Sequence, residues 1–95
     1  MNALRLLKYV RSFVDGRVRL RHPALRNENV LQRAAERLRA LEGVQSVEGN
    51  AASGSVLIVY DSERIPRDRV IALGEAWATY LDNLQAGKPA EMPSL

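Results

Sequence analysis

The stretch LRALEGVQSVEGNAASGSVLIVY, residues 38–60, carries the clearest signals of secondary structure in this chain. It opens at the end of an apolar helical stripe, and Gly43 is placed to end that helix in a left-handed conformation. A short strand is expected over Val44–Glu48, followed by a hairpin loop with a glycine at each end. The run Ser55–Tyr60 is rich in β-branched and aromatic residues without polar alternation, which predicts a central strand buried on both faces.

An amphipathic helix is expected on each side of this stretch. The first begins near Asn27 or Asn29, either of which can cap it with a side-chain oxygen, and it runs to Glu42. The second follows Pro66, which suits a first helical turn. Its stripe of apolar residues at helical spacing comprises Val70, Leu73, Trp77, Tyr80, Leu81 and Leu84.

Two further elements are predicted at the N-terminus. Arginines alternate with Val18 and Leu20 after Gly16, which is typical of a half-buried strand that ends at His22-Pro23. Apolar residues in the preceding residues 1–15 recur at helical spacing and predict an amphipathic helix; they are Leu4, Leu7, Val10 and Val14.

The order of these elements predicts an α+β sandwich, with β-α-β-β-α connectivity and both helices on one face of an antiparallel sheet. We expect one folded domain over residues 16–85, with the N-terminal helix added in front. The glycine and prolines of residues 86–95 predict a flexible tail. Because that tail makes a poor strand, no fourth strand is expected.

Composition and charge narrow the classes of function. The chain has 95 residues and no cysteine, which excludes disulfides, thiolate metal sites and thiol nucleophiles and fits a cytoplasmic location. The net charge is +3, but residues 1–26 carry seven basic side chains against one acidic side chain. Such an asymmetry attracts acidic proteins, anionic membranes or nucleic acid. No apolar run is long enough to span a bilayer.

Residues 38–60 and the segments on either side of them resemble a known protein family. The helix, Gly43-Val44, the short strand, the hairpin with Asn50 and Gly54, and the strand ending at Tyr60-Asp61 are similar to the heavy-metal-associated domain. That module of copper chaperones and metal-pumping ATPases has a ferredoxin-like βαββαβ fold. The resemblance covers roughly residues 16–72, and it implies a ferredoxin-like sandwich and a role in metal transport or homeostasis.

The resemblance also locates a metal loop that has lost its ligands. The family holds metal with a Met-x-Cys-x-x-Cys motif, and counting back from Gly43 places that motif at residues 25–30. Leu25 stands in place of the methionine, and Asn27 and Val30 stand in place of the cysteines. Soft ions such as copper(I) need thiolates, so metal transfer of the family type is not supported. The chain most resembles a cysteine-free branch, through the strand GRVRLR that begins at Gly16.

The missing fourth strand implies a partner. In a ferredoxin-like sheet the fourth strand lies beside the first, so its absence would leave the strand that begins at Gly16 with an open edge. The N-terminal helix or a second copy of the chain is expected to cover that edge. A dimer or higher homo-oligomer is therefore one expectation.

Two groups of residues are candidate sites. Arg17, Arg19 and Arg21 share one face of a strand and can grip an anionic partner, although their stems can also simply cover apolar surface. His22 and Glu28 are weak metal ligands, because no second histidine or cysteine accompanies them.

The expected function is a non-catalytic binding or adaptor domain that contacts another protein, such as a metal-transport protein, and that needs no cofactor. No catalytic constellation or nucleotide loop is present, so an enzyme is not expected. The alternatives are a weak metal site at His22 and Glu28, or a basic surface for anionic membrane or nucleic acid. Residues 2–14 would provide the membrane contact, whereas the lack of stacking aromatics on the strands disfavours nucleic acid.

Overall fold

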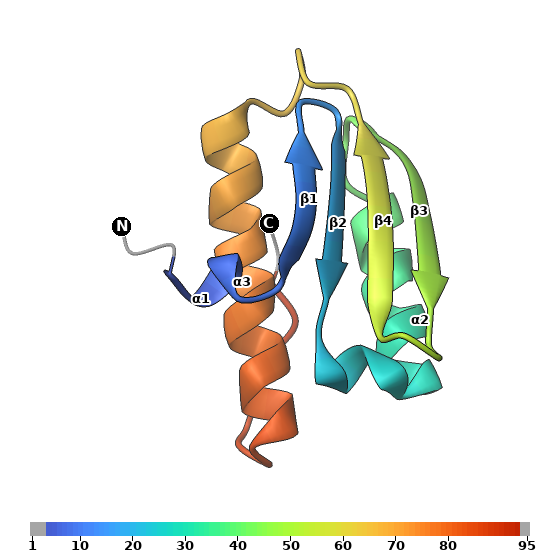
Figure 1. Ribbon diagram of the computed structural model, residues 1–95, viewed down its shortest axis with the longest axis vertical. Coiled ribbons are helices and arrows are strands. Elements are labelled where there is room, and N and C mark those ends of the chain that lie inside the picture. Colours follow the sequence, from blue (N-terminus) through green and yellow to red (C-terminus); the bar gives the residue numbers. More distant parts are fainter. Residues whose placement is uncertain (1–3, 94–95) are drawn as a thin grey trace.

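A four-stranded antiparallel sheet carries two long helices on one of its faces (Figure 1). The computed structural model describes residues 4–93. In spatial order the strands are β1 (Val10–Val14), β2 (Arg17–Arg21), β4 (Ser55–Tyr60) and β3 (Val44–Asn50). The helices are the one-turn α1 (Leu4–Leu7), the 3-10 turn η1 (Pro23–Arg26), α2 (Glu28–Arg39) and α3 (Arg67–Gln85).

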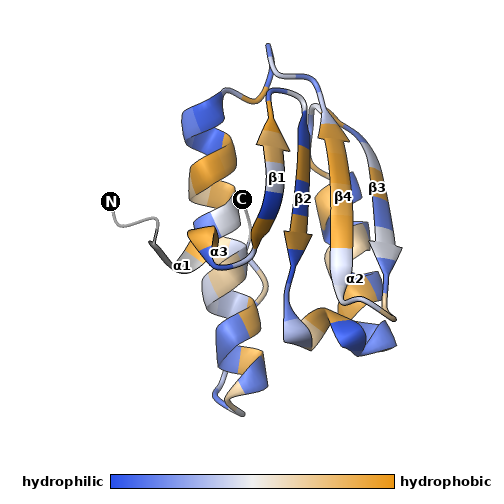
Figure 2. Cartoon of the chain, viewed as in Figure 1, coloured by the Kyte–Doolittle hydropathy of each residue, from blue (hydrophilic) through white to orange (hydrophobic). Residues whose placement is uncertain are grey.

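The core lies between the sheet and the two long helices. In β4 the residues Val56, Ile58 and Tyr60 are buried, while the residues between them are only half-buried. Figure 2 shows that β4 is hydrophobic along most of its length, whereas β2 alternates between hydrophilic and hydrophobic residues. An apolar cavity of about 80 Å³ remains within this core, and among the described residues no charged side chain lines it.

The predicted burial of β4 on both faces is therefore wrong on one side. The strand is central, between β2 and β3, as expected. Its outward residues Leu57 and Val59 lie on a sheet face that no element within residues 4–93 covers, and they are only partly buried. A continuous apolar run does not distinguish a covered face from an open one.

The predicted helix over residues 1–15 is also wrong. Only Leu4–Leu7 forms a helical turn, and Val10–Val14 is the strand β1, which pairs antiparallel with β2. Residues 1–3 of the predicted helix lie outside the described part of the chain. The turn Asp15-Gly16 joins the two strands, and Gly16 has a φ of 89°, which favours glycine.

A β-bulge explains why β1 resembles a helix in sequence. The register shifts between Val10 and Ser12, so that Arg11 is an extra residue on β1. Val10 then pairs with Leu20 and Phe13 pairs with Val18, and both pairs line the apolar cavity of the core. Two inward residues three positions apart are typical of a helix, but the bulge produces the same spacing in a strand.

The prediction that no fourth strand exists is corrected by the same element. β1 lies beside β2, which is the position that the fourth strand holds in a ferredoxin-like sheet. The strand comes from the N-terminus of the chain instead of its C-terminus. The architecture is a small α+β sandwich compatible with the ferredoxin-like fold, and the edge of β2 is paired.

The other two helices form where the sequence predicts them, but α2 ends at Arg39 and not at Glu42, because Ala40 caps it and Gly43 lies in the turn before β3. α2 starts after Asn27, which caps it, and Gly43 adopts a φ of 96° between α2 and β3. A side chain at Gly43 would meet Ile65, so the glycine also permits close packing. α3 ends in a Schellman motif at Gly87, with the N–H of Lys88 donating to the carbonyl of Asn83 at 2.9 Å.

The C-terminal tail folds back along α3 over its described residues. Ala90, Glu91 and Pro93 line a hollow together with residues of α3, and Met92 is half-buried against the core. Residues 94–95 of the predicted flexible tail lie outside the described part. Within residues 4–93, no helix is both long enough and apolar enough to cross a membrane.

Candidate functional site

The loop between β2 and α2, where the resembled family holds metal, is filled by packing and capping contacts. Leu25 lies in η1 and is only 2% exposed. The Oδ1 of Asn27 accepts hydrogen bonds from the N–H groups of Asn29 and Val30 at 2.9 and 3.2 Å, and so caps α2. Val30 is half-buried against the core. The three former ligand positions thus stabilise the helix start and the core.

His22 lies directly before this loop, and both of its ring nitrogens are occupied. The side chain is buried, with the residue 2% exposed. Nδ1 accepts a hydrogen bond from the N–H of Ala24 at 3.0 Å. Nε2 lies 2.8 Å from Oδ1 of Asp82. Because Nδ1 accepts, the ring hydrogen is assigned to Nε2, which donates to Asp82.

This tautomer disfavours a metal at His22. A metal ion binds a ring nitrogen through its lone pair, and the second nitrogen then carries the hydrogen. Here a hydrogen on Nδ1 would point at the N–H of Ala24, which is itself a donor. The geometry therefore favours a structural role for His22 over a role as a ligand.

Glu28 does not complete a site with His22. It lies in the first turn of α2, exposed to solvent, where a negative charge is favourable against the helix dipole. It lines a shallow polar hollow beside β3 with Gln32, Glu36 and Arg39. The structure pairs His22 with Asp82 instead. Within residues 4–93, no group of three or more histidine and carboxylate side chains is arranged to hold a metal ion.

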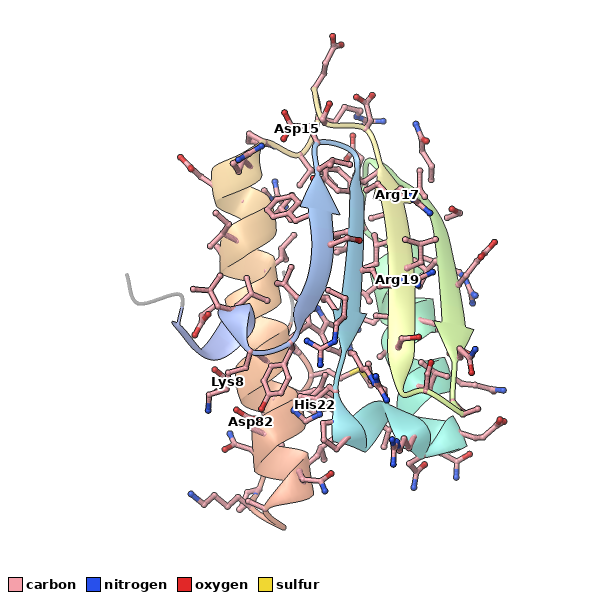
Figure 3. The ribbon with its side chains drawn as sticks, in the orientation of Figure 1. Lys8, Asp15, Arg17, Arg19, His22 and Asp82 are labelled. Atoms are coloured by element: carbon pink, nitrogen blue, oxygen red, sulfur yellow. The ribbon has the colours of Figure 1, made fainter. Side chains whose placement is uncertain are left out.

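Tyr9 joins His22 and Asp82 in a cluster that the sequence analysis did not identify. The hydroxyl of Tyr9 donates to the same Oδ1 of Asp82 at 2.5 Å. The rings of Tyr9 and His22 lie 4.3 Å apart at 48°. We call Tyr9, His22 and Asp82 the His22 cluster; Figure 3 labels His22 at the end of β2 and Asp82 on α3. Sixty positions separate His22 from Asp82, so no local pattern reveals the pairing.

The open face of the sheet carries the predicted arginines. Arg17, Arg19 and Arg21 alternate with the inward residues of β2 and are exposed, and we call these three residues the arginine face (Figure 3). The Nε of Arg21 donates to the carbonyl of Ser53 at 2.9 Å, which ties that side chain to the β3–β4 hairpin. Within residues 4–93, no hydrogen bond or ion pair joins the side chain of Arg17 or Arg19 to another residue, so both guanidinium groups are available.

Apolar side chains lie beside the arginine face. Arg17 pairs across β2 and β4 with Val59, and Arg19 pairs with Leu57. Val14 pairs with Arg17 on the other side and is 61% exposed. The open face therefore combines a cationic row with an uncovered apolar strip.

On the β3 side of the apolar strip, the open face carries one polar and one acidic residue. Glu48 of β3 pairs with Leu57, and Ser46 pairs with Val59. Leu57 thus lies between Arg19 and Glu48. Tyr60, the aromatic residue of β4, points into the core and is 5% exposed. Because the strands present no aromatic ring on this face, it lacks the stacking platform that ferredoxin-like sheets use for RNA.

Comparison with protein families identifies a relationship that covers most of the chain. The model of a family described as heavy metal associated domain 2 matches residues 6–75. The matched range includes β1 and the arginine face and extends into α3. No curated protein and no solved structure matches the chain.

Proposed function

The chain belongs to the heavy metal associated domain 2 family and contains no cysteine, and on that premise we propose that it is a non-catalytic binding domain that contacts another protein in metal transport or homeostasis. The arginine face carries this proposal. It places cations beside apolar side chains on a sheet face that no element of the domain covers. As part of the same proposal we place the domain in the cytoplasm, where a chain without disulfides suits the reducing conditions.

The former metal loop supports recognition over metal transfer. Transfer of copper(I) needs thiolate ligands, and the three positions that would supply the motif are an apolar core residue, a helix cap and a half-buried valine. His22, the only histidine, is hydrogen-bonded at both nitrogens. The domain thus keeps the family fold while its loop serves stability.

Self-association is less well supported than contact with a different protein. A homo-oligomer is expected if β2 has an open edge, but β1 pairs with that edge. Two copies that met through their open faces would bring their arginines together, and like charges repel. A membrane contact through residues 2–14 also loses its basis, because an amphipathic helix is not formed over Val10–Val14.

Site-directed photocrosslinking tests the proposal. Ser12 is exposed and pairs with Arg19, so a benzoylphenylalanine at position 12 samples the open face. The same group at position 37 samples the exposed side of α2 as a control. In native extract we expect an adduct of discrete mass from position 12 only, and we expect Arg19→Glu to abolish it.

Metal binding is measured on the same purified protein. We expect no stoichiometric copper(I) or Zn²⁺, and identical calorimetric traces for the native chain and His22→Ala. Tight binding of one metal ion per chain would overturn the proposal, as would equal adducts from positions 12 and 37.

A further inference from the structure

The spacing of the arginine face defines what can bind it. Alternate residues on a strand are about 6.7 Å apart, so Arg17 and Arg21 are separated by about 13 Å with Arg19 between them. Four residues of an α-helix rise about 6 Å. Carboxylates at every fourth position of a helix therefore follow the same row, and the length of the arginine side chains absorbs the remaining difference.

The apolar strip fixes the second requirement. Leu57 and Val59 lie next to the arginine row, one strand away, at about 4.8 Å. An uncovered sheet face buries its apolar side chains best against a helix or a second sheet. A helix whose carboxylate stripe is bordered by an apolar stripe would cover both rows together.

The charges of the face give the helix an orientation. The cations lie on β2, whereas Glu48 lies on β3 at the far side of Leu57. Carboxylates of a partner are attracted to the β2 side and repelled from the β3 side. The partner's acidic stripe must therefore lie over β2, with its apolar stripe over β4.

From this geometry we infer that the open face binds an acidic amphipathic helix of another protein, with carboxylates over Arg17 and Arg19 and apolar side chains on Leu57 and Val59. The inference rests on the proposed function and names the class of partner. Arg21 is tied to the carbonyl of Ser53 and supports the row from one end. Arg17 and Arg19 supply the pairing, since neither guanidinium group is hydrogen-bonded or ion-paired to another side chain or carbonyl among the described residues.

A synthetic peptide supplies the probe. It carries glutamate at every fourth position and leucine three residues after each glutamate, and a shuffled peptide of the same composition lacks the two stripes. We expect the striped peptide to bind the full chain at low salt, and added salt to weaken the binding because the contacts are exposed charges. The shuffled peptide cannot place carboxylates on the arginines and leucines on the apolar strip at the same time. We expect it to bind at least about tenfold more weakly, which corresponds to a loss of about 1.4 kcal/mol of binding free energy.

Paired charge reversals locate the contact. Arg17→Glu/Arg19→Glu should weaken binding of the striped peptide at least about tenfold, since like charges would then oppose each other. Arg33→Glu/Arg37→Glu makes the same change of charge on the exposed side of α2 and should leave the affinity unchanged. Arg17→Gln/Arg19→Gln serves as a milder variant, and circular dichroism checks that each variant is folded.

Several outcomes would overturn the inference. Equal affinity for both peptides, or equal loss in both charge-reversal pairs, would show binding without a shaped site. Tighter binding to phosphatidylglycerol vesicles or to single-stranded RNA would assign the face to another class of partner. Failure of the peptide together with a discrete crosslink at position 12 would reject the helix and keep the proposed function, whereas loss of both would reject both.

Discussion

Nε2 of His22 holds the end of β2 against α3 through the carboxylate of Asp82, and Nδ1 holds the start of η1 by accepting from the N–H of Ala24. The hydroxyl of Tyr9 reaches the same carboxylate from the segment before β1. A buried polar group costs free energy unless its hydrogen bonds are made, and here the ring of His22 makes both. His22, the residue that most suggests a metal site, therefore has a structural role: its cluster joins the end of β2, α3 and the segment before β1.

Removal of His22 tests this structural role. His22→Ala should lower the free energy of unfolding by about 2–4 kcal/mol, because it leaves a cavity, removes one hydrogen bond of Asp82 and leaves the N–H of Ala24 without its acceptor. Urea denaturation followed by circular dichroism measures the change. Tyr9→Phe removes one hydroxyl from the same cluster and should cost only about 1 kcal/mol. If His22→Ala were as stable as the native chain, the cluster would not hold these segments together.

The β1–β2 hairpin is the element that completes the sheet, and its turn depends on one glycine. Gly16 has a φ of 89°, and its carbonyl accepts from the N–H of Tyr60 at 3.0 Å. A Cβ at this position would lie 3.2 Å from the carbonyl oxygen of Tyr60. Both the backbone conformation and the close approach therefore favour glycine.

Replacement of this glycine tests the hairpin. Gly16→Ala should lower the free energy of unfolding by about 1–2 kcal/mol, since a side chain is strained at a positive φ and would press on Tyr60. Gly87→Ala is the matched control. Gly87 also has a positive φ, of 71°, but a Cβ there meets no atom within 4 Å. Thermal unfolding of the two variants separates strain alone from strain with crowding, and a larger loss at Gly87 would contradict this account.

The N-terminal segment, α1 and β1, completes the fold by covering the edge of the sheet and contacting α3. β1 covers the edge of β2, Leu6 is buried against Gly74 of α3, and the N–H of Leu6 donates to the carboxylate of Glu75 at 3.1 Å. The radius of gyration is 12.1 Å, close to the roughly 12 Å expected for a compact chain of this length. The segment therefore supplies both an edge strand and a contact to the last helix.

Truncation tests the closure of the sheet. A chain that lacks residues 1–15 would expose the edge of β2 and the inner surfaces of Val18 and Leu20. We expect it to form dimers or larger species in light scattering, because an open edge recruits other strands. A chain that lacks residues 88–95 should keep the oligomeric state of the full-length protein. A monomeric and stable product of the first truncation would show that β1 is dispensable.

Periodicity predicted the elements whose pattern is regular. α2, α3, the β3–β4 hairpin and β2 were each expected, because their apolar residues repeat at the spacing of the element and glycine or asparagine marks their ends. β1 was missed because the bulge at Arg11 gives a strand the spacing of a helix. The open face of β4 cannot be predicted, because a run of apolar residues does not show whether another element packs against each face of the strand.

Some features of the candidate site can be predicted from the sequence, and others need the three-dimensional structure. Alternation along β2 predicted that Arg17, Arg19 and Arg21 share a face, and the register confirms it. The positions Leu25, Asn27 and Val30 followed from the resemblance, but their packing and capping contacts needed coordinates. Tyr9 and Asp82 carried no local signal, since their only relation to His22 is through space.

The absence of thiolates, the row of arginines and the two helices follow from the amino-acid sequence, because they depend on residue identity and on spacing within one element. The folded chain is needed to show which strand pairs with β2, which face of the sheet stays open and what the ring of His22 bonds to. Those features depend on contacts between segments far apart in the chain. Such contacts form when the elements bury their apolar faces together, and no local repeat records them.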